Sequence, residues 1–318
     1  MKKAVIYFIA TVLITVGIPA LFVLHSGVYK KPLPEEETKI KVYIKAEDRI
    51  YETTRAQYLK EVVSAEMPAS FESEALKAQA VAARSYLLSR IGAYEKGTPP
   101  PEHNGADICT DPAHCKAWIS EAARRELWGK DADKNWRKIS LAVDDTSGEV
   151  ATCGGEIISA VFHSTSSGKT ENSRDVWGGE RSYLVSVDSP GEQDAPHFKS
   201  ELTLTRDEFC RIAAENFAGV DFTKGIIGNI TRSDAGGIIT IEIGGVQVRG
   251  TAFRTAYGLR STNVQLCEQA DGTIYFDVTG YGHGVGMSQY GANAMAKNGA
   301  TYQDILKHYY TGIEIEKR

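Results

Sequence analysis

The chain has 318 residues, with 36 lysines and arginines against 41 aspartates and glutamates, so its formal net charge is −5. This acidic balance argues against nucleic acid as the main partner, because binding to phosphates needs a basic surface. Cysteine occurs five times, at positions 109, 115, 153, 210 and 267. An odd number cannot all pair within one chain, which argues against a disulfide framework.

The start of the chain predicts a membrane anchor. Residues 4–24 contain no charged side chain, and a helix of this length extends roughly 31 Å, enough to cross a bilayer core. No small-x-small cleavage site stands out at its end, which favours an uncleaved anchor over a signal peptide. Lys2 and Lys3 favour a cytoplasmic N-terminus, although Lys30 and Lys31 compete on the other flank. We expect a cytoplasmic tip and anchor in residues 1–25, a tether in 26–38 and one folded body in 39–318.

The body is expected to begin with a strand and two helices. Alternation of apolar and polar residues over 40–44 predicts the strand. The first helix, from Arg55, ends near Glu66 because Met67 precedes a proline, and a pre-proline residue disfavours the α region. The second helix starts near Ser73 and buries one face at helical spacing. That face consists of Leu76, Ala80, Ala83 and Leu87.

Glu66 differs from its acidic neighbours because it is predicted at the C-terminal end of a helix. The negative end of the helix dipole disfavours a carboxylate, and a carboxyl that keeps its proton is what a general acid requires. Glu66 is therefore the candidate catalytic residue, with a solvated helix-terminal glutamate as the alternative. Arg84 is a candidate to orient this carboxylate, with an ordinary exposed arginine as the alternative.

Shorter elements follow along the chain. Periodicity predicts helices over 116–128 and 134–144, and strands over 150–153, 157–162, 183–187 and 274–279. Thr205 and Glu208 form a capping box that opens a helix, and Thr301 caps a last helix. Gly244 and Gly245 join two strands of a hairpin. Without regular βαβ alternation this order predicts an α+β fold, with helices and short antiparallel strands forming a lobed body around a substrate cleft.

Two thiols and two imidazoles gather in one irregular segment: His103, Cys109, His114 and Cys115. They can supply the four ligands of a tetrahedral zinc ion, and such a closed site would be structural. The alternatives are a disulfide between Cys109 and Cys115, or free surface residues. We favour zinc because two histidines flank the same thiols.

A run of hydroxyl-bearing residues, HSTSSG at 163–168, follows a predicted strand. It lacks the G-x-S-x-G elbow and a placed aspartate, so a Ser/His hydrolase is a weak interpretation. His163, Ser164 and Ser166 fit hydrogen bonding to sugar hydroxyl and acetamido groups, with turn capping as the alternative.

A second run, YGHGVGMSQY at 281–290, has glycines at alternate positions. These glycines permit positive φ and close approach of the backbone to a ligand, but there is no phosphate-binding lysine. For Ser288, the alternative to a ligand contact is a cap on the next helix.

Four separated stretches together resemble the stage II sporulation protein D family. They are EMP followed by ALKAQAVAARSY in 66–86, the segments 163–192 and 250–262, and the glycine-rich 280–296. The resemblance extends over nearly all of residues 39–318. The matched motifs do not include Cys109 and Cys115, so the resemblance lends no support to zinc.

The resemblance implies a membrane-anchored lytic transglycosylase that cuts peptidoglycan between N-acetylmuramic acid and N-acetylglucosamine. Glu66 would be the acid and base. A hydrolytic glycosidase ordinarily needs two carboxylates, and Glu171 and Asp175 are interpreted as local caps. One carboxyl suffices if the C6 hydroxyl of the muramic sugar replaces water, which gives a 1,6-anhydro product. The substrate contacts implied near the groove are Tyr281, His283, Gln289 and Tyr290.

The resemblance also implies a cellular setting. The body would lie on the extracytoplasmic side of the mother-cell membrane during engulfment of the forespore. Its partners would be glycan strands, a sporulation amidase/endopeptidase of SpoIIP type and a membrane partner. The alternative function is a noncatalytic wall-binding scaffold that stimulates an amidase.

Overall fold

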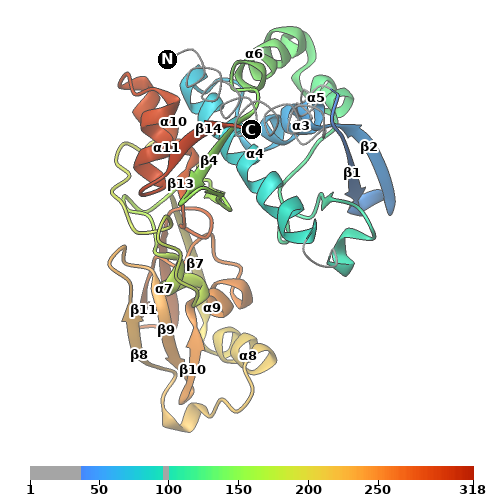
Figure 1. Ribbon diagram of the computed structural model, residues 1–318. Helices are drawn as coiled ribbons and strands as arrows, with labels where there is room; N and C mark the ends of the chain where they lie inside the picture. Colours follow the sequence, from blue (N-terminus) through green and yellow to red (C-terminus); the bar gives the residue numbers. More distant parts are fainter. Residues whose placement is uncertain (1–36, 96–99) are drawn as a thin grey trace, which may run out of the picture.

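The computed structural model describes residues 37–95 and 100–318 (Figure 1). The fold is organised around two hydrophobic cores. The first core draws on residues 40–184 and 285–313. The second core draws on residues 209–278, which lie between these two segments. The second lobe is therefore an insertion into the first. Mixed helices and short strands confirm the predicted α+β class.

The expected anchor and almost all of the tether lie outside the described residues. Within the described residues, no helix is both long and apolar enough to cross a membrane. The first strand, β1 (Lys39–Ile44), starts where the folded body is predicted to start, and its alternate residues are buried as expected.

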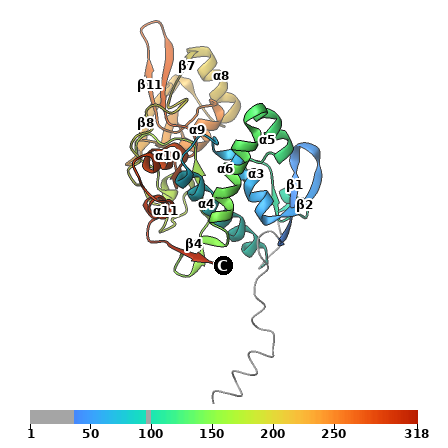
Figure 2. The same cartoon turned by 90° about the horizontal axis from the view of Figure 1, so that it is seen from above.

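Helix α4 (Ser73–Glu95) runs through the first lobe among other helices (Figure 2). Its predicted apolar face is buried. The alanines on this helix allow close approach, because the distance between packed helices depends on the side chains at the contact. The neighbouring helices are α3 (Arg55–Glu66), α6 (Ala132–Asp145), α10 (Gln289–Lys297) and α11 (Tyr302–Tyr309).

The break between α3 and α4 lies where the sequence predicts it. The Thr54 hydroxyl caps the start of α3 by accepting the Gln57 N–H at 3.2 Å. Met67 has φ −123° and ψ 141°, an extended conformation that the following Pro68 imposes by steric clash. Glu66 is therefore the last helical residue.

Short sheets border the helices of the first lobe. β1 lies between an antiparallel β2 and a parallel β3, β4 lies between β5 and β14, and β6 pairs with β13 in parallel. The prediction of antiparallel strands is therefore wrong for two pairs, β1 with β3 and β6 with β13. The bounds are β2 (Arg49–Thr54), β3 (Ile108–Cys109), β4 (Glu149–Cys153), β5 (Glu156–Ile157), β6 (Phe162–His163), β13 (Met287–Ser288) and β14 (Glu314–Lys317).

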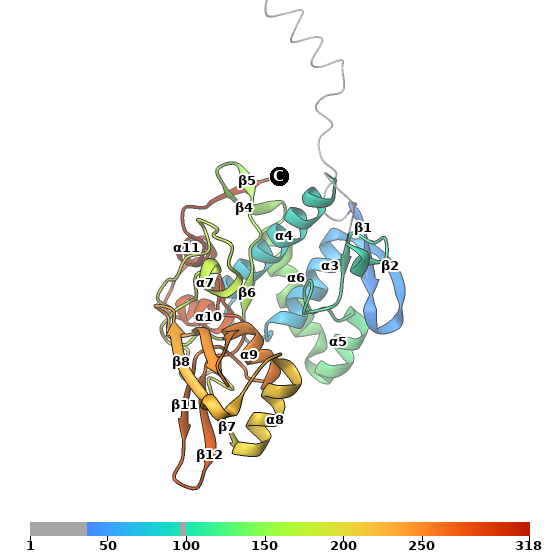
Figure 3. The same cartoon turned by 90° about the horizontal axis from the view of Figure 1, so that it is seen from below.

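The second lobe contains two antiparallel sheets of three strands. The hairpin at Gly244 and Gly245 is confirmed, with φ of +53° and +74°, and so is the capping box of Thr205 and Glu208. Helix α9 lies on the side of this lobe that faces the first lobe (Figures 1 and 3). The elements are β7 (Lys199–Thr205), α8 (Arg206–Asn216), β8 (Ile227–Arg232), β9 (Ile238–Ile243), β10 (Val246–Arg249), α9 (Gly250–Ala256), β11 (Val264–Glu268) and β12 (Thr273–Thr279).

Three local predictions are wrong. Residues 116–120 are not helical, because the Ser120 hydroxyl caps the start of α5 (Glu121–Trp128). Residues 183–187 form no strand, and only the ends of 157–162 pair with other strands. The remaining short helices are Lys45–Glu47, Pro101–His103, Gly129–Asp131, Phe222–Lys224 and α7 (Ser173–Trp177).

Candidate functional site

The Glu66 carboxylate is held by two neutral donors from distant segments. The Ala117 backbone N–H donates to Oε1 at 3.0 Å, and Gln289 Nε2 donates to Oε2 at 3.1 Å. Glu66 is half-buried at the end of α3. Each oxygen therefore has a fixed donor, and the carboxylate can still be reached from outside.

Helix α10 brings Gln289 to this position. Its Asn293 side chain accepts the Glu72 N–H at 2.8 Å, at the start of α4. The Tyr290 ring meets the Phe71 ring edge-on, with centroids 4.9 Å apart. The expected cap is present, because the Ser288 hydroxyl accepts the Gly291 N–H at 3.2 Å. The break after Glu66 and the start of α10 are thereby locked together.

The glycine-rich loop before α10 depends on its glycines. Gly282 and Gly286 have φ of +120° and +73°, which disfavours other residues. A Cβ at Gly286 would lie 2.2 Å from the Val161 carbonyl oxygen, and one at Gly282 would lie 2.7 Å from the His163 Cβ. The loop therefore packs directly against residues 161–165.

Two cavities adjoin at Glu66, which lines both of them. The first cavity, of about 890 Å³, lies among α5, α6 and the start of α10. The second cavity, of about 650 Å³, lies between residues 112–117, residues 159–163 and α9 of the second lobe. A long polymer can therefore pass Glu66 with units on both sides of it.

Most predicted contact residues line these cavities. Ser164, Gln289 and Tyr290 line the first cavity, whereas His163, Tyr281 and His283 line the second. Segments predicted separately, 163–168 and 281–290, thus meet at one cleft.

The two histidines are neutral near pH 7. His163 Nδ1 donates to the Val285 carbonyl at 3.2 Å, and the Val285 N–H donates to His283 Nδ1 at 3.1 Å. Burial lowers the pKa of His163 to about 4. Burial and the neighbouring His163 lower the pKa of His283 well below its usual value. Both rings therefore act as hydrogen-bonding groups and not as cations.

The predicted roles of Ser166 and Arg84 are corrected. Ser166 is buried, and its hydroxyl donates to Glu192 Oε1 at 2.7 Å, so it holds the loop together. Arg84 is fully buried and donates to the carbonyls of Glu149 at 3.1 Å and Val143 at 3.2 Å. Neither residue lines the two cavities. Their polar side chains serve backbone groups and a carboxylate inside the first lobe.

Several residues of the second cavity were missed. Lys116 follows a predicted metal ligand, and burial lowers its pKa to about 8. Its ammonium lies 3.7 Å from the centre of the Phe162 ring. Trp177 and Arg254 also line this cavity. Both lie in the stretches that carry the family resemblance, which was the available signal.

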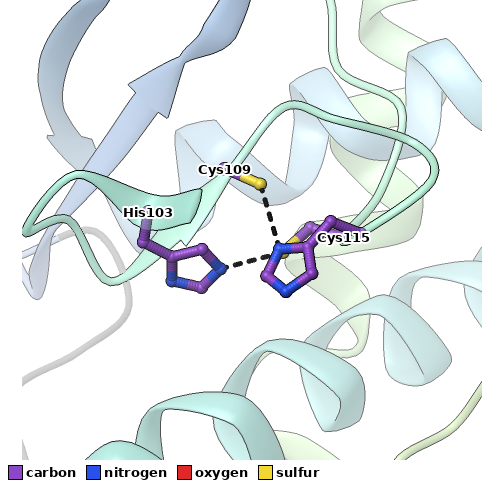
Figure 4. Close-up of side chains that lie close together, drawn as sticks. His103, Cys109 and Cys115 are labelled. Atoms are coloured by element: carbon purple, nitrogen blue, oxygen red, sulfur yellow. Dashed lines mark hydrogen bonds between the residues drawn. The ribbon is translucent and has the colours of Figure 1, made fainter. Parts of the chain in front are cut away.

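The four predicted metal ligands come together. Their ligand atoms all lie within 4.8 Å of one another, and Figure 4 shows the side chains of His103, Cys109 and Cys115 converging. His103 Nε2 lies 3.2 Å from Cys115 Sγ, and His114 Nδ1 lies 3.5 Å from both sulfurs. A Cys2His2 set converging at these distances fits tetrahedral zinc, and it leaves no ligand position for substrate.

The chemistry of the thiols fits a cation. The hydrogen bond from Cys115 lowers the pKa of the Cys109 thiol to about 5 and raises that of Cys115. One thiolate therefore forms easily, and a metal ion would stabilise the second. Because Cys115 lies two residues before Ala117, this segment also places the N–H that binds Glu66.

The geometry defines a two-lobed cleft protein with one held carboxylate where two cavities meet. Residues 43–153 match the family model described as "SpoIID: Stage II sporulation protein". The chain is 36% identical over 286 residues to stage II sporulation protein D of Bacillus subtilis (strain 168), covering 90% of this chain and 81% of that protein. The Bacillus amyloliquefaciens protein of the same name is 35% identical, with 90% and 80% covered. The chain belongs to the stage II sporulation protein D family.

A more distant relative carries a different name. The amidase enhancer of Bacillus subtilis (strain 168) is 28% identical over 311 residues. The match covers 81% of this chain but only 40% of that protein.

Proposed function

We propose that this sporulation protein is a lytic transglycosylase that cleaves peptidoglycan glycan strands between N-acetylmuramic acid and N-acetylglucosamine. The observation that carries this proposal is the single held carboxylate of Glu66 where the two cavities adjoin. Among the described residues, Asp131 is the only other carboxylate that lines either cavity.

One carboxyl is enough for this reaction. Protonated Glu66 gives its proton to the glycosidic oxygen as the bond to C1 breaks. The resulting carboxylate then accepts the proton of the C6 hydroxyl as that oxygen bonds to C1. Ala117 and Gln289 hold the two oxygens in place between the steps. A hydrolase would need a second carboxylate to activate water or to act as the nucleophile.

The test is the product formed in water labelled with heavy oxygen. We expect 1,6-anhydro-muramic ends without label, and near-complete loss of cleavage in Glu66→Gln. Asp131→Asn should change the rate of cleavage and leave the product unchanged. Glu215→Gln, on the exposed face of α8, is the control for loss of a negative charge. Labelled reducing ends that disappear in Asp131→Asn would identify a hydrolase with Asp131 as its second carboxylate.

The similarity to the amidase enhancer supports a second candidate, a noncatalytic wall-binding scaffold that stimulates an amidase. The two functions differ in their dependence on Glu66. A scaffold should stimulate a sporulation amidase equally well as wild type and as Glu66→Gln, without releasing anhydro sugars.

We further propose the setting that the sequence predicts. Residues 1–25 would anchor the protein in the mother-cell membrane, with the body facing the wall, an amidase/endopeptidase and a membrane partner. The Cys2His2 cluster would hold structural zinc. Zinc would act there on folding, because four protein ligands leave no open position.

A further inference from the structure

The wall of the second cavity is strongly basic. Four basic side chains line it, and Glu66 at its edge is its single acidic one. The first cavity is more balanced, with two carboxylates against three basic side chains. Because the whole chain has a net charge of −5, this positive charge is a local concentration. The four residues are Arg90, Lys116, Arg181 and Arg254.

None of the ion pairs within the described residues involves three of these cations, Lys116, Arg181 and Arg254. The Glu66 carboxylate attracts the Lys116 ammonium without forming an ion pair with it. On the outer surface of the second lobe, by contrast, Arg211 pairs with Glu215 at 2.9 Å. Lys116 is buried and Arg254 is half-buried, whereas Arg181 is exposed at the rim. A buried or half-buried charge without a close partner costs free energy. Such groups are typical of sites where a ligand of opposite charge binds.

The second lobe offers a free guanidinium edge at this wall. Within the described chain, the one hydrogen bond of the Arg254 guanidinium runs from Nε to the Leu259 carbonyl at 3.2 Å. Its two Nη atoms are therefore available, and paired arginine nitrogens match the two oxygens of a carboxylate.

The same cavity has features that fit a sugar. His163 is only 4% exposed, and its Nε2 has no hydrogen-bond partner. Because Nδ1 donates to the Val285 carbonyl, Nε2 is an acceptor for a ligand hydroxyl or amide. Trp177 and Tyr281 are 43% and 39% exposed, and such ring faces can lie against a sugar ring. A basic wall beside these groups suits a sugar that carries an acid.

We propose that the second cavity binds a carboxylate carried by the glycan strand, with Lys116, Arg181 and Arg254 as specificity-determining residues. The inference rests on the proposed function for the path of the strand past Glu66. Muramic acid carries a lactyl ether that ends in a carboxyl group. That carboxyl is free where no stem peptide is attached, whereas an attached peptide converts it to an amide and brings carboxylates of its own.

Binding to the full-length chain in detergent tests the inference, with Glu66→Gln preventing turnover. The probes are a peptide-free tetrasaccharide of alternating glucosamine and muramic sugars, its lactyl methyl ester, and the same saccharide carrying stem peptides. Calorimetry should show the free acid binding about tenfold more tightly than the ester, the change expected for one hydrogen bond to a charged group. If the peptide supplies the carboxylate, the peptide-bearing probe should bind more tightly than both. Equal affinity for all three probes would overturn the inference.

A second substitution assigns the effect to the basic wall. Adding Arg254→Gln should weaken binding of the preferred probe about tenfold and leave the ester unchanged. Arg254→Lys should restore part of the preference. Arg211→Gln, which removes an ion-paired arginine from the same lobe, should change nothing. An equal loss for acid and ester in Arg254→Gln would mean that Arg254 only supports the fold.

Failure of this inference can be told apart from failure of the proposed function. Binding is measured in a chain that cannot turn over, and cleavage is measured in the wild type. A preference for the acid without anhydro products would keep the carboxylate site and exclude the transglycosylase. Anhydro products without a preference for the acid would keep the transglycosylase and exclude the carboxylate site.

Discussion

At the scale of single residues, Glu66 receives one backbone N–H and one side-chain amide from segments far apart in the chain. The backbone donor depends on the segment after Cys115. The side-chain amide of Gln289 depends on the position of α10, which Asn293 and Tyr290 fix against the start of α4. Gln289 is therefore a positioning residue for the carboxylate.

Gln289→Leu should reduce kcat for glycan cleavage about tenfold with a smaller change in KM, because one oxygen of Glu66 loses its fixed donor. The measurement is initial rate against substrate concentration. Gln247→Leu, on an exposed position of β10, is the control. A change confined to KM would indicate that Gln289 binds sugar and does not orient Glu66.

The pH dependence of stability tests the burial of His163. Burial lowers its pKa to about 4 in the folded chain, against about 6.5 when unfolded. Between these values the unfolded chain binds more protons, so the free energy of unfolding falls as the pH falls from about 6.5 to about 4. His163→Asn should remove up to about 3 kcal/mol of this loss.

Urea unfolding at several pH values between 4 and 7 measures this difference. His197→Asn, at an exposed histidine, is the control. His283 is still present in His163→Asn, so a smaller slope should remain. Identical pH dependence in wild type and His163→Asn would contradict the burial of a neutral imidazole.

At the scale of elements, the segment from His103 to Ala117 joins the four predicted metal ligands to the Glu66 carboxylate. It has little regular structure of its own beyond β3 and one short helix. Side chains that bind a common metal ion can therefore fix the conformation of this segment, a role that backbone hydrogen bonds have in a helix or sheet.

Cys109→Ser should lose bound zinc and lower the melting temperature by several degrees, because a structural ion contributes folding free energy. Metal analysis and thermal unfolding measure the two effects. Cys267→Ser, exposed on β11, should change neither. Native mass spectrometry that finds a Cys109–Cys115 disulfide and no zinc would show that the alternative interpretation is right.

At the scale of the whole molecule, the cleft is built by two lobes with separate cores. The second lobe reaches the site through α9, whose Phe253 is buried in the second core while Arg254 lines the second cavity. The path of the chain also shapes the cleft. The chain leaves the first lobe before residue 199 and returns to it with the glycine-rich loop and α10.

A fragment of residues 37–318 should be soluble and keep the melting temperature of the body. The cut lies before Thr38, whose carbonyl accepts the Arg55 N–H at 2.8 Å. Gel filtration and thermal unfolding are the measurements. A fragment starting at residue 46 is the contrast and should unfold, because it loses the buried residues of β1. Aggregation of 37–318, with cleavage only in detergent, would contradict a separate anchor and body.

Local rules of the chain were enough for several parts of this protein. The stop at Glu66 follows from the neighbouring proline, and the capping boxes at Thr205 and Thr301 follow from side chains three residues away. The hairpin at Gly244 is equally local. The convergence of His103, Cys109, His114 and Cys115 was also predictable, because the four residues lie within one short segment.

The tertiary structure alone decided which polar residues face the cleft. Arg84 and Ser166 look like candidate contacts in the sequence, yet burial turns them toward internal carbonyls and Glu192. Lys116 and Arg254 look ordinary, yet packing brings them to one cavity with Glu66. The reason is physical: these positions depend on contacts between segments far apart in the chain, which neither periodicity nor capping encodes.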